Sequence, residues 1–322
     1  MLSDEQLQRA AEILKAGGAV GLPTETVYGL AADAENEIAV RRIFAIKGRP
    51  SHHPLIVHLA DVDAARSWVT SFPPQAELLA RLFWPGPLTL VLPRSSRASD
   101  AVTGGQPTVA IRVPRHPVAL AVLSRFGGGI AAPSANRFGG VSPTTAEHVR
   151  QDLGAQLELI LDGGPSQVGI ESTIVDLSSD GGPAILRPGA ITQSQLEEAL
   201  GVQVPVREKT DVRVSGSLPS HYAPRAGVVL CSATELGARA QALLDGGQKV
   251  ATLAPAAVAI SPNVRVWQLP DAPAGYAQQL YAALREIDAL GFDVIVVVEP
   301  EQQGVGIAIH DRLRRAAAPR TG

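Results

Sequence analysis

The chain has 322 residues, of which 45% are hydrophobic and 18% charged, and its formal net charge is −3. This composition excludes an intrinsically disordered chain, and the near-neutral charge excludes a protein-wide positive field that would attract nucleic acid or anionic membranes. The single cysteine, Cys231, excludes an internal disulfide framework and cysteine-rich metal sites. The start of the chain is not that of a signal peptide, and its apolar runs are too short to span a bilayer, so we expect a cytoplasmic protein.

Capping signals and apolar runs predict alternating helices and strands in the first two thirds of the chain. Ser3 with Gln6 has the spacing of a capping box and predicts a helix that ends at residues 17–18. Thr192 with Gln195 predicts a second capped helix, which ends near Leu200. Between them we expect strands at 19–22, 55–59, 88–92, 109–113, 130–132, 157–161 and 174–177, and helices at 36–46, 118–123 and 145–151.

The expected strand at 109–113 carries an arginine in a specific place. Side chains alternate between the two faces of a strand, so Val109, Ile111 and Val113 share one face. Arg112 then lies on the opposite face with Thr108 and Ala110. This pattern indicates that the Arg112 side chain has a specific position on one face of the sheet and is not simply exposed to solvent.

After residue 205 the pattern changes. Residues 206–225 are polar, lack periodicity and are predicted to be a linker between a domain at 1–205 and a domain at 226–322. In the second domain we expect strands at 227–231, 249–253, 264–269 and 293–298. The expected helices lie at 234–244 and 306–317, with a third that has Tyr276, Leu280, Leu284 and Ile287 on one stripe. Such alternation predicts a small parallel sheet covered on both faces.

Four clusters rich in glycine, proline and polar residues could carry chemistry. They lie at 23–29, at 47–50, at 132–136 with Ser142, and at 169–173 followed by 186–189. Arginine and lysine side chains together with hydroxyl groups suit phosphate and carboxylate ligands. The alternative for the 47–50 cluster is a solvated basic turn. The groups concerned are Lys47, Arg49, Arg112, Arg187, Thr26, Ser134, Ser142 and Ser172.

Several other chemistries are disfavoured. The chain has neither a G-x-x-x-x-G-K-[ST] loop nor a convincing G-x-G-x-x-G motif that opens a helix, which argues against a P-loop or nicotinamide enzyme. His52 and His53 are adjacent and have no metal-ligand spacing around them, so no metal site is predicted. His58, inside an apolar strand, reads either as a core histidine or as a site residue.

Taken together, seven ordered segments resemble the YrdC-like family, and more narrowly its two-domain form. Lys47-Gly48-Arg49 followed far downstream by Ser134-Ala135-Asn136 matches the family signature of Lys-x-Arg and Ser-x-Asn. The segments span residues 23–30, 47–50, 54–58, 84–89, 132–136, 171–173 and 187–189, and residues 220–224 and 304–315 extend the match over the whole chain.

This resemblance implies a nucleotidyltransferase. L-threonine, bicarbonate and ATP would give L-threonylcarbamoyl-AMP, pyrophosphate and water, the first step towards threonylcarbamoyladenosine (t6A) in tRNA. It implies an α/β fold with a twisted mixed sheet in the catalytic domain and a smaller Rossmann-like α/β/α domain at the C-terminus. It also implies ATP accompanied by Mg²⁺ without a dedicated protein site. The implied partners are the machinery that transfers the threonylcarbamoyl group to tRNA and, weakly, tRNA itself.

The resemblance also implies site residues. Lys47 and Arg49 correspond to the catalytic signature, and Tyr222 makes the linker a lid over the nucleotide. The implied threonine-binding residues are Thr26, His58, Arg112, Ala132 and Ser172. The implied nucleotide-binding residues are Arg49, His53, Thr108, Ser134, Asn136, Ser142, Arg187 and Tyr222.

The chain departs from the family pattern at two places. Residues 214–218 stand where many relatives have a Pro-Gly-Met run, and His53 stands where relatives often have asparagine. Two other functions stay open. A carbamoyl-adenylate former of the hydrogenase-maturation type would need cysteine-rich zinc fingers, and a non-catalytic RNA-binding module would use more than the 4% aromatic residues present.

Overall fold

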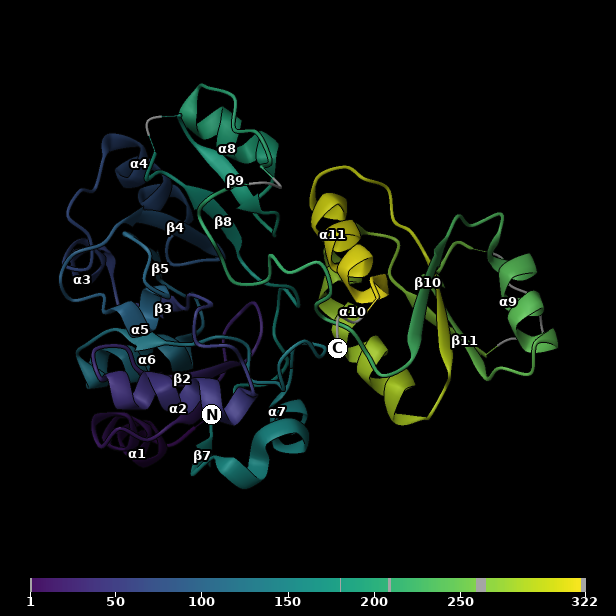
Figure 1. The fold of residues 1–322 in the computed structure, drawn as a ribbon, viewed down its shortest axis with the longest axis horizontal. Coiled ribbons are helices and arrows are strands. Elements are labelled where there is room, and N and C mark those ends of the chain that lie inside the picture. Colours follow the sequence, from purple (N-terminus) through teal and green to yellow (C-terminus); the bar gives the residue numbers. More distant parts are fainter. Residues whose placement is uncertain (1, 180, 208–209, 259–264, 320–322) are drawn as a thin grey trace. The chain divides into compact units, whose positions relative to one another are not determined.

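The computed structural model describes residues 2–179, 181–207, 210–258 and 265–319, and the chain divides into two compact units (Figure 1). Unit 1 comprises the residues to Phe138, Pro143–Gln167 and Glu171–Ser217. Unit 2 comprises two short loops, Gly139–Ser142 and Val168–Ile170, and the chain from Leu218 onward. Of the predicted linker at 206–225, the described residues up to Ser217 therefore lie with unit 1.

The described strands of unit 1 form one mixed sheet in the order β7-β1-β2-β6-β3-β5-β4-β8-β9. Strand β5 pairs parallel with β3 and antiparallel with β4, which in turn pairs parallel with β8. The predicted mixed sheet is confirmed. Its strands are β1 (Val20–Leu22), β2 (Gly29–Asp33), β3 (Ile56–His58), β4 (Leu88–Pro93), β5 (Thr108–Arg112), β6 (Ile130–Ala131), β7 (Leu159–Ile160), β8 (Thr173–Asp176) and β9 (Ala184–Arg187).

Five helices of unit 1, α1, α2, α6, α7 and α8, begin within two residues of the predicted starts, whereas α3, α4 and α5 lie outside the predicted helices. Both capping boxes are present, and the Asn36 side chain caps α2, which ends at the left-handed Gly48. These helices are α1 (Asp4–Lys15), α2 (Glu37–Lys47), α3 (Val62–Arg66), α4 (Pro74–Phe83), α5 (Asp100–Thr103), α6 (Pro117–Phe126), α7 (Ala146–Leu153) and α8 (Gln193–Leu200), with a 3-10 turn η1 at Gly154–Gln156.

Two strands of the sheet lie outside the predicted strands. Residues 29–33 form β2, and Leu186 and Arg187, expected in a polar connection, belong to β9. Strand β9 is short and is followed by Pro188-Gly189, so its own sequence gives little strand signal. Its antiparallel pairing with β8 stabilises it.

The predicted alternation of β5 is confirmed. Val109 and Ile111 lie in the main core, which covers one face of the sheet. Ala110 faces the other way, into a smaller apolar cluster with Ile56, Val91, Ile174, Leu186 and Val214. Arg112 shares the face of Ala110, because alternate residues of a strand point to the same side.

Unit 2 is the predicted small parallel sheet, in the order β10-β13-β11-β12. Val294, Val296 and Val298 pack with α9, and the alternate residues Ile295 and Val297 are also fully buried, so both faces are covered. The stripe from Tyr276 to Ile287 is buried as predicted. Residue 264, the expected start of β12, lies outside the described residues. The elements are β10 (Gly227–Cys231), α9 (Leu236–Asp245), β11 (Val250–Pro255), β12 (Arg265–Leu269), α10 (Pro273–Ala289), β13 (Val294–Val298) and α11 (Val305–Ala317).

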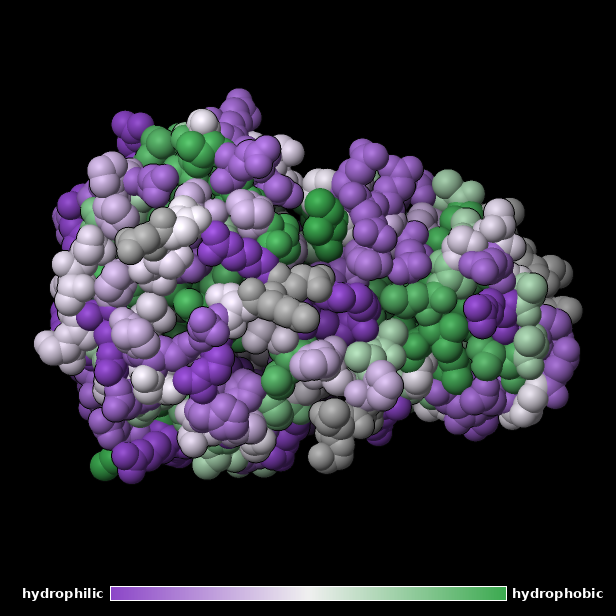
Figure 2. All heavy atoms as spheres, turned by 45° about the horizontal axis from the view of Figure 1, so that its top comes forward, coloured by the Kyte–Doolittle hydropathy of each residue, from purple (hydrophilic) through white to green (hydrophobic). Residues whose placement is uncertain are grey.

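The face of unit 1 that Figure 2 shows is largely polar. Figure 2 shows hydrophilic residues over most of its visible face, and its large exposed hydrophobic residues, such as Ile38 and Leu82, come from separate helices. In the described ranges we find no helix that combines the length and the apolar character needed to cross a membrane.

The packing predicts that Gly129→Ala destabilises unit 1. A Cβ at Gly129 would lie 2.3 Å from Cζ2 of the buried Trp68 ring and 2.8 Å from Val57 Cγ1. Because neither neighbour has room to move, we expect a loss of about 2 kcal/mol or more in unfolding free energy. Gly154→Ala is the matched control, since its Cβ would make only an ordinary contact with Arg150. Equal melting temperatures for the two variants would contradict this account of the core.

Candidate active site

One face of the unit 1 sheet gathers most of the predicted site residues. His58 of β3 lies beside Arg112 of β5 in register, and Ile174 of β8 lies beside Arg187 of β9. Strand β4 connects these two pairs of strands, because its Val91 pairs with Ala110 of β5 and its Thr89 pairs with Ile174 of β8. Paired residues point to the same face, so the side chains of Thr108, Arg112, His58 and Arg187 all lie on one face of the sheet. The small apolar cluster around Ala110 occupies its centre.

Arg112 is buried on this face and is held by three groups. Its Nε donates to the Gly86 carbonyl at 3.1 Å, Nη1 to Thr26 Oγ1 at 2.9 Å, and Nη2 to Glu25 Oε1 at 2.7 Å. The Arg112 and Glu25 side chains are only 4% and 1% exposed. Each terminal nitrogen carries a second N–H, for which the described residues provide no acceptor. Such N–H groups can donate to the carboxylate oxygens of a ligand.

Glu25 balances the buried charge of Arg112. Burial alone would raise the pKa of the Glu25 carboxyl, but the charge and hydrogen bond of Arg112 outweigh it and lower that pKa below its ordinary value. The Glu25 carboxyl is therefore ionised at neutral pH. The sequence interpretation missed Glu25, although its place between Thr24 and Thr26 in a predicted site loop was a usable signal.

His58 is neutral at physiological pH. Burial, reinforced by the nearby charge of Arg112, lowers the pKa of its imidazole to about 3. Its Nδ1 lies 3.3 Å from the Ile56 carbonyl oxygen. The ring is thus a buried uncharged neighbour of Arg112, and it can exchange a hydrogen bond with a ligand without adding positive charge.

Lys47, at the end of α2, is fully engaged with the Ser-x-Asn turn. Its Nζ donates to the carbonyl oxygens of Ser134 at 2.5 Å and Asn136 at 2.6 Å, with Asn136 Oδ1 at 3.5 Å. Burial, together with the charge of Arg49, lowers the pKa of Lys47 well below its ordinary value. The ammonium has three donors and three acceptors here, so in this structure it orders the turn that carries Ser134 and Asn136.

Arg49 and Arg187 are brought together by a single residue, Ser215. Arg49 Nη2 donates to the Pro54 carbonyl at 2.9 Å and to Ser215 Oγ at 3.2 Å, while Arg187 Nη1 donates to the Ser215 carbonyl at 2.9 Å. Arg187 Nη2 also donates to Ser172 Oγ at 3.0 Å, and that hydroxyl lies 2.8 Å from Thr89 Oγ1. The predicted threonine-site residue Ser172 is thereby linked to the predicted nucleotide-site residue Arg187.

The segment at residues 210–217 lies across this face. Val214, with Val212 beside it, packs into the apolar cluster around Ala110. The backbone of Arg213 exchanges two hydrogen bonds with the Gln106 side chain, at 2.6 and 3.0 Å. This part of the predicted linker is therefore docked on unit 1.

The remaining predicted residues fall into two groups. Ala132 lies at the edge of the face, with its backbone N–H on the Ile56 carbonyl, and His53 is half-buried against Phe138. Burial and the charge of Arg49 lower the pKa of His53 to about 4. Ser142 and Tyr222, in contrast, both belong to unit 2.

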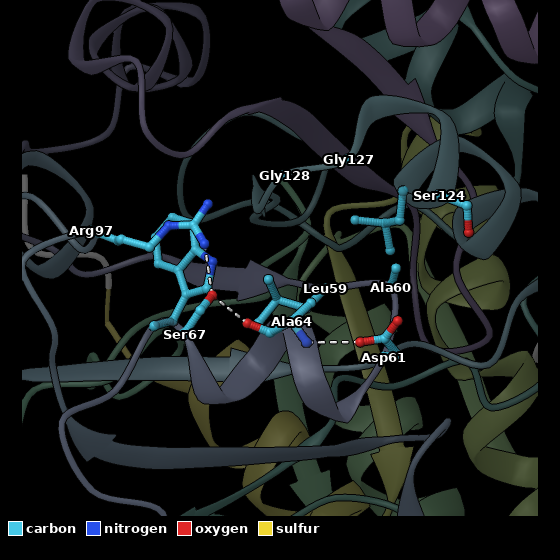
Figure 3. A pocket seen from close by; sticks show the side chains of 11 residues that line it. Leu59, Ala60, Asp61, Ala64, Ser67, Arg97, Ser124, Gly127 and Gly128 are labelled. Carbon is cyan, nitrogen blue, oxygen red and sulfur yellow. Dashed lines mark hydrogen bonds between the residues drawn. The ribbon is translucent and has the colours of Figure 1, made fainter.

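Metal-ligating side chains do not cluster in the described ranges. No group of three or more histidine, cysteine, aspartate or glutamate residues there is arranged to hold a metal ion. Figure 3 shows a pocket of about 310 Å³ elsewhere on unit 1, where Arg97 donates to Ser67 Oγ and pairs with Glu35. Its described lining includes none of the predicted site residues.

A mixed α/β sheet with buried arginines on one face, followed by a parallel-sheet unit, defines a YrdC-like protein with an appended domain. A family model described as telomere recombination, which covers Sua5, YciO and YrdC proteins, matches residues 12–189. A second model, the C-terminal domain of threonylcarbamoyl-AMP synthase, matches residues 191–318. The chain belongs to the threonylcarbamoyl-AMP synthase family, whose members are nucleotidyltransferases.

Relatives and solved structures agree with this placement. The threonylcarbamoyl-AMP synthase of Pyrococcus abyssi is 38% identical over 99% of this chain and 96% of its own length. That of Bacillus subtilis is 41% identical over 99% of this chain and 94% of its own length. The crystal structure of P. abyssi Sua5 complexed with L-threonine matches with a TM-score of 0.93 at 37% identity, covering 98% of this chain and 95% of the other.

The neutral, buried His58 predicts a specific pH dependence of stability. In the unfolded chain histidine takes up a proton near pH 6.5, whereas in the folded protein it does so near pH 3, so falling pH favours unfolding within that window. In His58→Asn we expect the slope of unfolding free energy against pH to lose the contribution of one proton, which is about 1.4 kcal/mol per pH unit. Denaturant unfolding in a Trp267→Phe background, where Trp68 and Trp84 report on unit 1, measures it. An unchanged slope would show that His58 titrates normally.

Proposed function

We propose that this chain joins L-threonine, bicarbonate and ATP to form L-threonylcarbamoyl-AMP, pyrophosphate and water. The observation that carries the proposal is Arg112, a buried guanidinium fixed by Glu25 and Thr26 with one N–H on each terminal nitrogen left for a ligand. Such a group is suited to the carboxylate of an amino acid. The family membership and the L-threonine bound in the P. abyssi structure support the choice of amino acid.

The threonine site is proposed around Arg112. The amino-acid carboxylate binds the two remaining N–H groups, and the side-chain hydroxyl and amine are placed among Thr26, His58 and Ser172. We propose that a small space near Ala132 receives the side chain of the amino acid. A site that hydrogen-bonds a substrate hydroxyl rejects analogues that lack it, and a small one rejects bulkier side chains.

The nucleotide site is proposed around Arg49 and Arg187, with Thr108, Ser134 and Asn136. In this structure Ser215 accepts hydrogen bonds from both guanidinium groups. In the proposed complex, oxygen atoms of the ATP triphosphate accept these hydrogen bonds in place of Ser215. Lys47 acts through the turn that it orders, which fixes the positions of Ser134 and Asn136. Ser142, Tyr222 and His53 are the further nucleotide contacts of the proposal.

The chemistry needs no covalent enzyme intermediate. Bicarbonate takes up a proton and loses water to give CO₂. The neutral amine of threonine adds to the carbon of that CO₂ and loses a proton, which gives a carbamate. A carbamate oxygen then attacks the α-phosphorus of ATP, and pyrophosphate leaves with the electron pair of the broken P–O bond. The protein positions the reactants and stabilises the phosphate charge with Arg49 and Arg187. Mg²⁺ is proposed to enter on ATP, where it neutralises phosphate oxygens.

The product is an activated acyl-adenylate, so we propose that a transferase acting on tRNA consumes it in the cytoplasm. A direct tRNA contact by this chain would be weak, because its net charge is −3. The decisive assay is pyrophosphate release with ATP and bicarbonate, with and without L-threonine. Release that does not depend on threonine would overturn the proposal.

Arg112→Lys tests the threonine site. Lysine keeps the charge beside Glu25 but has no guanidinium fork, so we expect the KM for L-threonine to rise about tenfold or more with little change in the KM for ATP. Arg97→Lys, at an arginine paired with Glu35 away from this face, is the matched control and should behave as wild type. A rise in the KM for ATP alone would place Arg112 on the nucleotide.

Arg49→Ala tests the nucleotide site. We expect threonine-dependent pyrophosphate release to be abolished while the melting temperature shows a folded protein, because a fixed guanidinium on the phosphates is lost. Arg41→Ala, on the exposed side of α2 with a side chain 72% accessible, is the control. Near-normal turnover of the Arg49 variant would remove this residue from the proposed site.

A further inference from the structure

Thr89 lies inside strand β4 and points to the face of the sheet that carries the site residues. Its neighbour Leu90 belongs to the main core, whereas Val91 belongs to the small apolar cluster on the opposite face. Side chains alternate along a strand, so Thr89 shares the face of Val91. Thr89 is fully buried, and a buried hydroxyl group requires a hydrogen-bond partner.

Strand pairing places Thr89 between two arginines of the proposed site. The antiparallel pairing of β4 with β5 sets the residue after Thr89 opposite the residue before Arg112, so Thr89 lies beside Arg112. On the other side of β4, Thr89 pairs with Ile174 of β8, which in turn pairs with Arg187 of β9. Thr89 therefore lies between the arginine proposed to bind the amino-acid carboxylate and an arginine proposed to bind phosphate.

The side chains of Thr89 and Ser172 form a pair of hydroxyl groups. Their oxygens lie 2.8 Å apart, and Arg187 Nη2 donates to Ser172 Oγ at 3.0 Å. Among the described residues, no other group bonds to either hydroxyl, and Ser172 is only 1% exposed. The pair carries two hydrogens, of which one lies between the two oxygens. One O–H is therefore left to donate to a third group.

The proposed threonine site fixes which hydroxyl faces the ligand. Ser172 belongs to that site and stands in the loop before β8, whereas Thr89 lies within the sheet. Thr89 is then the inner member of the pair and donates to Ser172. Ser172 Oγ accepts from both Thr89 and Arg187, which occupies its two lone pairs. Its own hydrogen is left for the ligand, and the two accepted bonds make Ser172 a stronger donor.

A hydroxyl that only donates suits an anionic oxygen and not the N–H groups of an amine. The proposed reaction forms such oxygens between Arg112 and Arg187, because negative charge develops on both carbamate oxygens as the threonine amine adds to CO₂. One of these oxygens attacks the α-phosphorus, and the other becomes the carbonyl oxygen of the product. A hydrogen bond to the second oxygen stabilises the developing charge and leaves the nucleophile unoccupied.

We propose that Thr89 is a positioning residue for the carbamate step, which donates to Ser172 and so directs the Ser172 hydroxyl hydrogen to the carbamate oxygen that does not attack. The inference rests on the proposed function, since it takes the amino acid to lie on Arg112 and phosphate on Arg187. Thr89 itself does not touch the substrate. Its task is to determine which way the Ser172 hydroxyl group points.

Thr89→Val tests the inference, because valine keeps nearly the same shape and lacks the hydroxyl. A direct donor to a developing oxyanion contributes about 100-fold or more in rate, and Thr89 acts only through such a donor. We therefore expect the kcat/KM for bicarbonate, measured by pyrophosphate release, to fall about tenfold. The KM values for L-threonine and ATP should stay at their wild-type values.

Thr252→Val is the matched control. Thr252 of β11 in unit 2 is equally buried, and its hydroxyl donates to the Arg265 carbonyl at 3.3 Å. This variant loses a buried hydroxyl away from the proposed site, so it should keep wild-type kinetic constants. A general effect of losing a buried threonine hydroxyl would lower the activity of both variants.

Thr89→Ser and Thr89→Ala separate the hydroxyl from the packing of the side chain. Both variants lose the γ-methyl group, and only serine keeps the hydroxyl. We expect the serine variant to stay within about threefold of the wild-type kcat/KM for bicarbonate and the alanine variant to lose about tenfold. If Thr89→Val melts early, this pair still decides the question. Equal values for the serine and alanine variants would overturn the inference.

A double-variant cycle shows whether Thr89 acts through Ser172. Ser172→Ala removes the donor itself, so we expect it to lower the kcat/KM for bicarbonate about 100-fold. In that background Thr89→Val should cause no further loss, because the hydroxyl that Thr89 orients is gone. Losses that multiply, or a rise in the KM for L-threonine or ATP in Thr89→Val alone, would contradict the positioning role.

Failure of the inference is distinguishable from failure of the proposed function. If the wild-type protein shows no threonine-dependent pyrophosphate release, the proposed function is wrong. If the wild-type protein is active and Thr89→Val keeps the wild-type kcat/KM for bicarbonate, the function stands and the positioning role of Thr89 is wrong.

Discussion

The burial of the Arg112 guanidinium is the constraint on which the catalytic unit depends. A buried cation is tolerated only with a charged partner and satisfied donors, and breaking such a pair costs about 3–5 kcal/mol. Glu25 supplies the charge, so the loop after β1 has to lie against β5. That loop is fixed in turn by Ser166, which donates to the Thr24 carbonyl, and by Tyr28, whose hydroxyl bonds to Gly163 and Gly164. The same Arg112–Glu25 pair therefore orients the group proposed to bind a carboxylate and fixes the fold of the loop after β1.

A carboxylate that pairs with arginine away from solvent also fixes local structure in unit 2. The carboxylate of Asp311 pairs with Arg312 and Arg315, and those two arginines fix the ring of Tyr222 and the backbone before it. In both units a charged pair away from solvent enforces a conformation that the local sequence would not hold alone. Screening by salt weakens exposed pairs far more than these, so the two arrangements should be insensitive to ionic strength.

Local patterns predicted much of the fold and only part of the site. Capping boxes, the alternation of β5 and the apolar runs are local, so most strands of the two sheets and the face of Arg112 followed from the sequence, while β2 and β9 did not. Partners distant in the chain have no local signal. Nothing around Lys47 indicates that its ammonium binds Ser134 and Asn136, and nothing around Arg112 selects Glu25, 87 residues away. Strand β9 was missed for the same reason, because its pairing with β8 stabilises it.

Two short loops, Gly139–Ser142 and Val168–Ile170, belong to unit 2 although the chain on either side of each belongs to unit 1. Gly169 fits there because a Cβ would lie 2.4 Å from the Gln278 Cα of α10. The polypeptide is therefore interleaved, and no single cut separates the units. A truncation after Ser217 leaves both loops without the helices that shape them, so the shortened protein is a different molecule from unit 1 as it stands here. The two units are defined by which residues contact one another, and they do not correspond to two continuous stretches of the chain.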